Sequence, residues 1–495
     1  MLYVFPPSLG PCRNRSGRLY NGSDRDLLLR GNRIGAGMSV AESPIRGDGP
    51  GVSIGASSRW FVCALAFLLA PIDASLAQDA AAEQQRLYEQ MVRQPTNYEV
   101  TSAYVKVATE RGDYEAAISA LERLLYYNAD LPQVKYELGV LYYRLGAYEM
   151  ARRYFREALA NPKLDAATKA LIETNLSYSD KELQQSRLSV FAQTGLRYQT
   201  NASYAPSSGL VLFEGQDYGL LPSHGVKSDG NAFELFGVSH DYDLQDESGT
   251  VLETRLIGYG SEQFHLHDLD VALFDASFGP RMALAPGSLP GVTIKPYVAG
   301  GDGWVGGLPY LASVGAGLSF GIPVGARLTF EPNVEWRHMD FSLNTSNPLL
   351  SEFNSGGWFT SGVSSSYSFS DQFRIDARAY YRRGEASESF QSFNQWVGEA
   401  ALPYQFAPPF ASIPRSWMVS PFARIVRTAF DAPSPFIDPT VAHDDTEWVV
   451  GLILDTPVSQ NFGISTTVEF DYTDSTLTNY RQQNFSILSG PTARF

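Results

Sequence analysis

The sequence predicts an N-terminal α-helical repeat array followed by an antiparallel transmembrane β-barrel of about fourteen strands. Three observations support this fold class, an α + β membrane protein. Residues 188–495 alternate apolar and polar side chains along short segments and show no helical period. The chain ends on an aromatic residue, Phe495. Residues 78–187 contain a helical pattern that recurs at a spacing of 34 residues, as between Gly112 and Gly146.

The alternation is clearest between residues 462 and 472. The even positions are Phe462, Ile464, Thr466, Val468, Phe470 and Tyr472, and the odd positions are Gly463, Ser465, Thr467, Glu469 and Asp471. Successive side chains of a strand point to opposite faces, so this segment has one apolar and one polar face. A soluble β-sandwich also contains such strands. The uninterrupted run of strands and the terminal aromatic residue favour a barrel whose apolar face contacts lipid.

Breaking residues 188–495 at clusters of Gly, Pro, Asn and Asp gives about fourteen strands. Their approximate centres are Thr194, Leu235, Leu256, Phe274, Pro296, Gly315, Glu331, Val363, Ala377, Val397, Arg424, Gly451, Val468 and Leu488. About ten residues of each strand would span the membrane, which leaves the remainder for turns and loops.

The same alternation places charged residues on the polar face of several predicted strands. They are Arg327, Glu331, Glu335, Arg337, Arg374, Asp376, Arg378, Arg382, Glu469 and Asp471. Because the apolar face of a membrane barrel contacts lipid, these side chains are expected to face the barrel lumen. They would form either a paired network that fills the lumen or a polar conduit of mixed charge, and both arrangements require inward charges.

The predicted connections give the barrel a direction, because membrane barrels have short periplasmic turns and longer outer loops. Short connections are predicted at residues 245–249, 322–325, 370–372 and 457–460, and long ones at 201–230, 341–356 and 428–445. Residues 262–268 and 406–415 break this alternation. An even strand count returns Phe495 to the periplasmic side. The last strand, ending in Phe495, resembles the signal by which the barrel-assembly machinery recognises its clients.

Residues 1–77 have the features of a pre-sequence that ends in a signal peptide. Arg59 precedes the apolar run 61–70, which is too short to span a bilayer, and residues 75–77 form a small-x-small cleavage site. The preceding stretch, residues 1–56, has no regular pattern. A start at Met38 or later would be more natural for such a signal.

Composition excludes two classes of protein. The net charge of −15 argues against a nucleic-acid-binding surface. The mean hydropathy of −0.17 excludes a helical membrane protein but not a barrel, in which only alternate residues face lipid. Both cysteines, Cys12 and Cys63, precede the predicted cleavage site, so the mature chain is expected to be free of cysteine, as suits an oxidising compartment.

The recurring helical pattern aligns residues 112–118 (Gly-Asp-Tyr-Glu-Ala-Ala-Ile) with residues 146–152 (Gly-Ala-Tyr-Glu-Met-Ala-Arg). It resembles the tetratricopeptide repeat (TPR), with which it shares the period, the small residues at helix contacts and a closing Pro162. The resemblance implies a periplasmic TPR domain over residues 78–187. The concave groove would be lined by Lys106, Thr109, Tyr136, Val140, Tyr143 and Arg144. Either this groove holds an extended peptide, or the short array only stacks on the barrel mouth.

The sequence offers no convincing catalytic or cofactor-binding motif. It has no phosphate-binding loop and no His-Glu-x-x-His segment, so no catalytic residue, cofactor or metal is predicted. His265 and His267 would share one strand face, and Asp444 and Asp445 lie in a predicted loop. A solvated loop is the commoner explanation for each pair. An enzyme is therefore the minority interpretation.

A signal peptide, a short TPR domain and a C-terminal barrel together resemble the surface lipoprotein assembly modifier (Slam) family over residues 79–495. The start of the first strand, residues 195–201 (Gly-Leu-Arg-Tyr-Gln-Thr-Asn), is similar to the start of that family's barrel. The resemblance implies a factor in the outer membrane of a Gram-negative bacterium that moves or displays client lipoproteins at the cell surface. Its partners would be outer-membrane lipid, the barrel-assembly machinery and a client lipoprotein or other periplasmic protein.

Two further functions remain open. One is a TPR-barrel porin that exports exopolysaccharide, although that class usually has a longer TPR array and a larger barrel. The other is an outer-membrane enzyme. The sequence identifies neither the client nor the oligomeric state.

Overall fold

The computed structural model describes residues 74–162, 164–246, 248–285, 288–289, 291–325, 327–342, 353–370, 372–409 and 416–495. These residues form two compact units, one helical and one made of strands, which meet in the sequence between Gln184 and Gln185. The apolar run of the predicted signal peptide and both cysteines lie outside the described residues. Within the described residues, no helix is long and apolar enough to cross a membrane.

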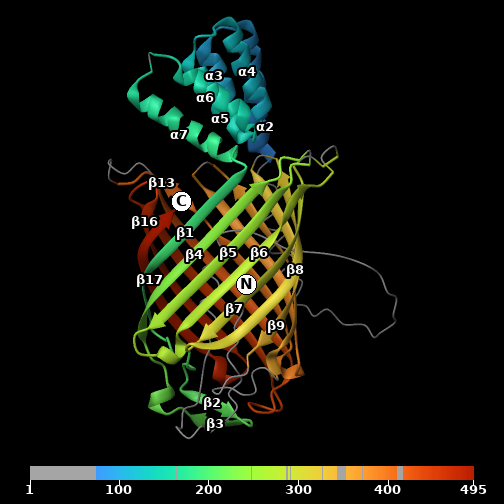
Figure 1. Ribbon diagram of the computed structural model, residues 1–495, viewed down its shortest axis with the longest axis vertical. Helices are drawn as coiled ribbons and strands as arrows, with labels where there is room; N and C mark the ends of the chain where they lie inside the picture. The colour runs from blue at the N-terminus through green and yellow to red at the C-terminus, as the bar shows by residue number, and fades with distance from the viewer. Residues whose placement is uncertain are drawn as a thin grey trace, which may run out of the picture. The chain divides into compact units, whose positions relative to one another are not determined.

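Six described helices form the helical unit (Figure 1). They are α2 (Ala74–Arg93), α3 (Tyr98–Glu110), α4 (Tyr114–Tyr127), α5 (Pro132–Arg144), α6 (Tyr148–Leu159) and α7 (Ala166–Glu182). The pairs α3–α4 and α5–α6 occupy the two predicted repeats. Gly112 and Gly146 stand in the turn within each pair, with left-handed φ angles of 77° and 74°. A side chain would be strained there, which accounts for glycine at the same place in both repeats.

The helical unit buries its apolar side chains between closely packed helices. A Cβ atom on Gly139 would lie 2.4 Å from the ring of Phe155, so the contact between α5 and α6 requires a residue without a side chain. Leu121, Leu138 and Phe155 are fully buried. Helix α7 covers the last repeat through Ile172, which is buried in one cluster with Phe155. This is the arrangement expected of a helical protein in water.

The second unit is a closed antiparallel barrel (Figure 1). Its sheet has 15 strands, of which β13 (Tyr404–Phe406) is a three-residue addition, so 14 strands close the barrel through the pairing of β12 with β14. The strands are β1 (Ser186–Gln199), β4 (Asp229–Asp243), β5 (Val251–Gln263), β6 (Val271–Ala283), β7 (Thr293–Val305), β8 (Leu308–Val324), β9 (Leu328–Phe341), β10 (Gly356–Ser368), β11 (Arg374–Ala386), β12 (Phe393–Ala401), β14 (Trp417–Pro433), β15 (Ala442–Pro457), β16 (Phe462–Ser475) and β17 (Gln482–Arg494). Each predicted strand centre lies in one of them, and the predicted fold class is confirmed.

The barrel exposes apolar side chains and buries polar ones. In β16, Phe462 and Ile464 are 55% and 47% exposed, whereas Thr467 and Glu469 are 6% exposed. An outer surface of this kind is stable in lipid and not in water, because the apolar residues have no protein partner. The barrel is therefore of the outer-membrane type.

Exposed aromatic side chains form two bands on the outer surface. One band contains Tyr242, Phe369, Tyr404, Phe462 and Phe495, and the other contains Tyr198, Trp336, Phe359, Trp396, Trp448 and Tyr472. Such bands mark the two interfaces of the membrane. Beyond the second band the outward residues are acidic, as at the exposed Asp340, Glu385 and Asp431, so the strands continue past the apolar belt.

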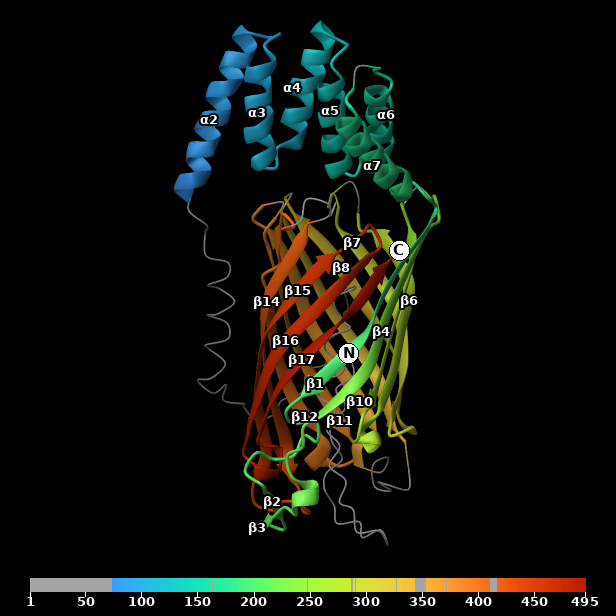
Figure 2. The ribbon, with the colours of Figure 1, turned by 90° about the vertical axis from the view of Figure 1, so that its left-hand side faces the viewer.

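The two ends of the barrel differ. We call the end where β1 begins and β17 ends the terminal rim, and the opposite end the distal rim. Figure 2 shows the hairpin of β2 (Leu210–Phe213) and β3 (Gln216–Gly219) at the end opposite to the C-terminus. The connection that carries it, residues 200–228, is a long distal loop, as predicted, and most of the other predicted long loop, 341–356, lies outside the described residues.

Two features depart from the predicted connections. The expected loop at 428–445 is wrong in extent, because β14 continues to Pro433 and β15 starts at Ala442. The distal connection between β7 and β8 is a turn of only Gly306 and Gly307, both with positive φ. Of residues 406–415, expected as a long connection at the terminal rim, Phe406 ends β13 and 410–415 lie outside the described residues.

Candidate functional site: a cavity in the barrel

The barrel encloses a cavity of about 1600 Å³. Its lining residues come mainly from the terminal-rim part of the strands, such as Arg281 near the end of β6 and Lys295 near the start of β7. The lining reaches the terminal rim at Pro323, Pro403 and Arg494. The candidate site therefore occupies the terminal half of the lumen.

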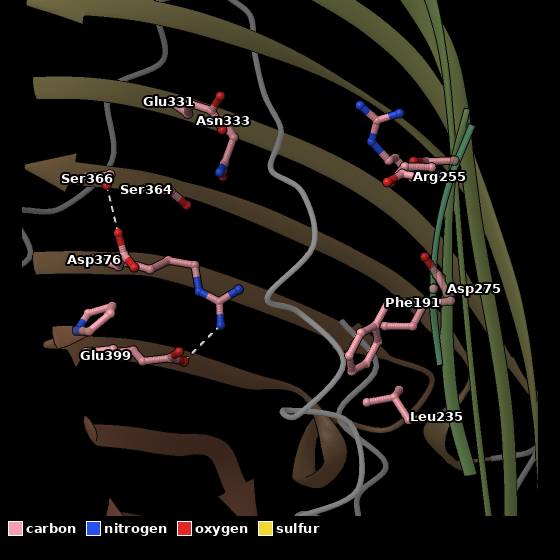
Figure 3. Close-up of a pocket in the computed structure, with 18 of the residues that line it drawn as sticks. Phe191, Leu235, Arg255, Asp275, Glu331, Asn333, Ser364, Ser366, Asp376 and Glu399 are labelled. Atoms are coloured by element: carbon pink, nitrogen blue, oxygen red, sulfur yellow. Dashed lines mark hydrogen bonds and ion pairs between the residues drawn. The ribbon is translucent and has the colours of Figure 1, made fainter. Parts of the chain in front are cut away.

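One side of the cavity is polar and is formed by β9–β12 (Figure 3). This polar wall consists of Glu331, Asn333, Ser364, Ser366, Asp376, Arg378 and Glu399. Ser366 Oγ donates to Asp376 Oδ1 at 2.7 Å, and Arg378 Nη2 donates to Glu399 Oε2 at 2.9 Å. The strand register places Ser364 opposite Glu331 and Ser366 opposite Asp376, because every second residue points inward.

Next to the polar wall, three basic side chains surround Glu253. Arg281 Nε donates to Glu253 Oε1 at 2.6 Å, and Lys295 Nζ donates to Glu253 Oε2 at 2.9 Å. An Arg255 nitrogen lies 3.5 Å from the same carboxylate. These residues come from β5, β6 and β7, so the cluster ties three strands together near the terminal rim.

A second cluster is centred on Arg337, which is 7% exposed. Its Nε donates to Glu335 Oε1 at 2.6 Å, and its terminal nitrogens donate to Asp275. Tyr297 Oη donates to Glu335 Oε2 at 2.6 Å. Charges removed from bulk water are stable only when paired and hydrogen-bonded, and this cluster meets that condition.

Glu331 differs from its neighbours in the cavity. It makes no hydrogen bond or ion pair with any residue that the structure describes, although the Glu253 cluster is nearby. It is half-buried and faces the cavity from β9. Its carboxylate can therefore accept hydrogen bonds from a group that enters the cavity.

The opposite side of the cavity is apolar and is formed by β17, β1, β4 and β5, which are neighbours in the sheet. This apolar wall consists of Phe191, Phe233, Leu235, Ile257, Tyr259 and Leu488, which pack together in one cluster. Figure 3 shows Phe191 and Leu235 across the cavity from the polar wall. The lumen of a membrane barrel is usually polar, so an apolar wall inside it is unusual.

An aromatic layer covers the inner face of β8–β12 and β14 on the distal side of the cavity, whereas the distal inward residues of β1, β4 and β16, such as Arg197, Asn231 and Asp471, are polar. The layer consists of Tyr310, Leu311, Met339, Phe341, Trp358, Tyr380, Phe393, Val397, Val426 and Phe430, all buried. Arg382 lies where this layer meets the cavity, with its guanidinium carbon 5.2 Å from the Trp358 ring centroid and 5.3 Å from that of Tyr380. Its Nε also donates to Thr360 Oγ1 at 3.2 Å.

The distal loops are joined to one another by hydrogen bonds. Asn479, 3% exposed, donates to the carbonyl of Leu212 at 3.1 Å and accepts from the Leu212 N–H at 2.6 Å. The hairpin also donates from Glu214 and Gly215 to the backbone of residues 436–437. The β2–β3 hairpin is thereby held against two other distal loops.

The structure brings most of the predicted lumen residues into this cavity. Those that line it are Glu331, Glu335, Arg337, Arg374, Asp376, Arg378, Arg382 and Glu469. Asp471 is buried on the inner side of β16, closer to the distal rim. Arg327 lies in the turn before β9 and does not line the cavity.

The six predicted TPR groove residues do not form one open surface. Tyr136, Val140 and Tyr143 are half-buried and pack against the cluster that contains Ile172 of α7. Tyr136 Oη accepts a hydrogen bond from Asn175 of α7 at 3.3 Å. The chain's own last helix thus covers this part of the expected groove. Of the others, Lys106 and Arg144 are exposed and Thr109 is half-buried.

Sequence reasoning missed the Glu253 cluster and the apolar wall. Glu253 and Arg255 alternate with apolar residues in the segment 251–257, so the signal used elsewhere would have found them. The apolar wall had no such signal, because its residues occupy the inner face, where polar side chains are expected.

The other residues that the sequence analysis singled out lie elsewhere in the barrel. His265 Nδ1 lies 2.8 Å from Asp229 Oδ1, and the described residues contain no cluster of three or more potential metal ligands. Residues 317–321 match a Gly-x-Ser-x-Gly pattern, but they lie inside β8 and Ser319 is fully buried. That motif needs a strand-to-helix turn to expose its serine. Phe495 pairs its backbone with Val190 and packs its ring on Phe462 at 5.9 Å.

Comparison with known protein families supports the predicted helical repeats. Residues 132–161 match the model of the tetratricopeptide repeat, which confirms the second predicted repeat. No curated protein matches the sequence of this chain.

Several solved structures are similar to the chain at low levels. The anion-selective porin from Comamonas acidovorans shares 8% identity at a TM-score of 0.32, covering 63% of this chain and 99% of the porin. A bacterial polysaccharide outer membrane secretin shares 11% identity at a TM-score of 0.30, covering 61% of this chain and 98% of the secretin. OmpT of Vibrio cholerae shares 11% identity at a TM-score of 0.29, covering 63% of this chain and 99% of OmpT. Similarity at this level says nothing of function.

The fold and the site together define the class of the molecule. It is an outer-membrane-type β-barrel of 14 strands, preceded in the chain by a helical domain with tetratricopeptide repeats.

Proposed function

We propose that this protein is an outer-membrane assembly or translocation factor that moves or displays client lipoproteins at the cell surface, as its resemblance to the Slam family implies. The observation that supports this best is the cavity itself. It is lined by paired charges of both signs and by an apolar wall, and it reaches the terminal rim. In this proposal the client enters the cavity from the terminal rim.

The order of the two units along the chain supports one direction for the barrel in this proposal. Helix α7 ends at Glu182 and β1 begins at Ser186, so the helical domain is tethered within a few residues of the terminal rim. In this proposal the terminal rim and the TPR domain face the periplasm, and the long loop at 200–228 faces outward. Membrane barrels generally have this orientation, with short turns on the periplasmic side.

The TPR domain would recruit the client or a partner. Because α7 covers Tyr136, Val140 and Tyr143, we assign recruitment to the exposed part of the first repeat around Lys106. Tyr98 lies on the same helix, is 39% exposed and donates a hydrogen bond to Glu137 of the next repeat. Aromatic side chains such as Tyr98 are enriched at the core of protein interfaces.

The test is deletion of the gene followed by surface proteolysis and proteomics of lipoproteins. We expect at least one lipoprotein to lose its surface exposure in the deletion strain and to regain it on complementation with the full chain. A matched strain should carry Lys106→Glu, which reverses the exposed charge on α3 while leaving the barrel unchanged. An unchanged surface proteome would refute the proposed function, and altered polysaccharide with unchanged lipoproteins would favour the exporter.

A further inference from the structure

Along several neighbouring strands, the inward residues change from charged near the terminal rim to apolar deeper inside the barrel. On β5 the inward residues run from Glu253 and Arg255 near the terminal rim to Ile257 and Tyr259 deeper inside. On β17 they run from Arg494 at the rim to Leu488 inside. The same order of charged rim and apolar interior therefore appears on strands at both ends of the apolar wall.

This change from charged to apolar residues matches an amphiphile that enters from the terminal rim, with its apolar part deeper in the lumen. Apolar surface that faces a hydrated cavity is unfavourable unless an apolar group covers it. Arg255, which donates to Asp241 Oδ1 at 2.5 Å, and Arg494 lie at the rim side of the wall, where the polar head of an amphiphile would lie. Arg494 lies over the Phe191 ring at 5.4 Å and pairs with Asp455 at 2.8 Å, so its position is fixed at the edge of the apolar wall.

A hydrocarbon chain fits this wall better than a peptide does. The backbone groups of β17, β1, β4 and β5 pair with one another within the barrel, which leaves no free strand edge along the wall for a peptide backbone. A peptide in the cavity would also have to satisfy its own buried amides. An acyl chain has no such requirement. On β5 the wall extends for about 7 Å, from Ile257 to Tyr259, at the usual rise per residue of a strand.

We infer that the cavity binds the acyl chains of a lipid-modified client, with the hydrocarbon on the apolar wall and the acylated N-terminal head at the rim near Arg255 and Arg494. The inference rests on the proposed function, because it takes the client to be a lipoprotein. The polar wall across the cavity, with Glu331 open to new hydrogen bonds, would contact the peptide that follows the acylated residue.

The experiment is photolabelling of the purified full chain in phospholipid nanodiscs. The probe is a diacylated cysteinyl peptide with a diazirine in one acyl chain, and the adducts are located by mass spectrometry. We expect adducts on β4, β5 and β17. Leu235→Asn should lower the yield about tenfold, as expected for a polar group replacing a well-packed apolar contact.

Leu273→Asn is the matched control for this experiment. Leu273 and Leu235 are 8% and 9% exposed in the same cluster, but only Leu235 lines the cavity. Both variants should show the heat-dependent gel mobility of a folded barrel. Adducts confined to lipid-facing residues, or equal losses in the two variants, would overturn the inference. So would labelling of the wall by a diazirine phosphatidylglycerol but not by the lipopeptide.

The outcomes separate the site from the proposed function. Absent labelling, together with loss of surface lipoproteins on gene deletion, overturns the acyl site and leaves the proposed function intact. Labelling as expected with an unchanged surface proteome overturns the proposed function and leaves an acyl-binding cavity.

Discussion

The helical unit and the barrel distribute the same residue types in opposite ways. In the helical unit Leu121 and Phe155 are 0% exposed. In the barrel Phe462 is 55% exposed, while Asp471 of the same strand is 4% exposed. The hydrophobic effect orders both units, because apolar atoms leave water for a protein core in one and for lipid in the other. The difference teaches that an alternating pattern identifies two faces, and the surrounding solvent decides which face turns inward.

The largest expected effect comes from breaking a buried ion pair in the barrel. Arg337→Met leaves the carboxylates of Glu335 and Asp275 without their cation and should lower the free energy of unfolding by about 3–5 kcal/mol. Urea unfolding in lipid vesicles, followed by tryptophan fluorescence, measures this change. The control is Arg374→Ala, because Arg374 and Asp376 are 45% and 38% exposed and their pair should contribute no more than about 1 kcal/mol. Equal losses in the two variants would show that the lumen screens charge as bulk water does.

In the helical unit the largest effect should come from an apolar residue instead. Phe155→Ala removes a fully buried ring beside Gly139 and should cost about 3–5 kcal/mol in the unfolding of the helices. Thermal loss of the far-UV helix signal in the full chain reports this change. The gel mobility of the folded barrel should stay normal, since the two units have separate cores. A simultaneous loss of the barrel would contradict that separation.

Two adjacent residues of β15 sharpen the comparison between lipid and lumen. Leu452 is 43% exposed on the outer surface, whereas Ile453 lines the cavity. Leu452→Arg should destabilise the barrel by about 2–4 kcal/mol, as a cation does in the apolar belt. Ile453→Arg should cost less, because its charge enters a cavity that already holds ion pairs. Unfolding in vesicles distinguishes the two, and the reverse order would show that the faces of β15 have been misassigned.

The smallest effect is a pH dependence in the helical unit. Burial raises the pKa of the Glu137 carboxyl above its ordinary value, against a smaller opposing effect of the hydrogen bond from Tyr98. The folded state therefore binds this proton more tightly than the unfolded chain. The resulting stability is fully present below the unfolded pKa, about 4.3, and is lost as the pH rises through the folded pKa.

Glu137→Gln removes this titration while keeping an acceptor for Tyr98. Raising the pH from about 4 to about 7 should then destabilise the natural helical unit more than the variant. Thermal unfolding by circular dichroism at the two pH values gives the difference. An identical pH response in the two proteins would mean that Glu137 is hydrated in the folded state.

Much of the barrel could be read from the sequence because strand alternation is local. The segment around Val468 has its polar residues inward and its apolar residues outward, as predicted. Around Leu235 the rule that polar residues point inward and apolar residues point outward fails. There Phe233 and Leu235 point inward and the exposed Glu234 points outward, which no local pattern could reveal.

The sequence by itself determined the order of helices and strands, the repeat period and the faces of most strands, because each depends on residues close together in the chain. Only the tertiary structure decided what the lumen contains. Barrel closure pairs Phe191 with Arg494 and Arg197 with Leu488, and it joins β1, β4, β5 and β17 into one apolar wall. Inward side chains acquire their partners only when distant strands become neighbours, so the cavity, its ion pairs and the aromatic layer follow from the closed barrel.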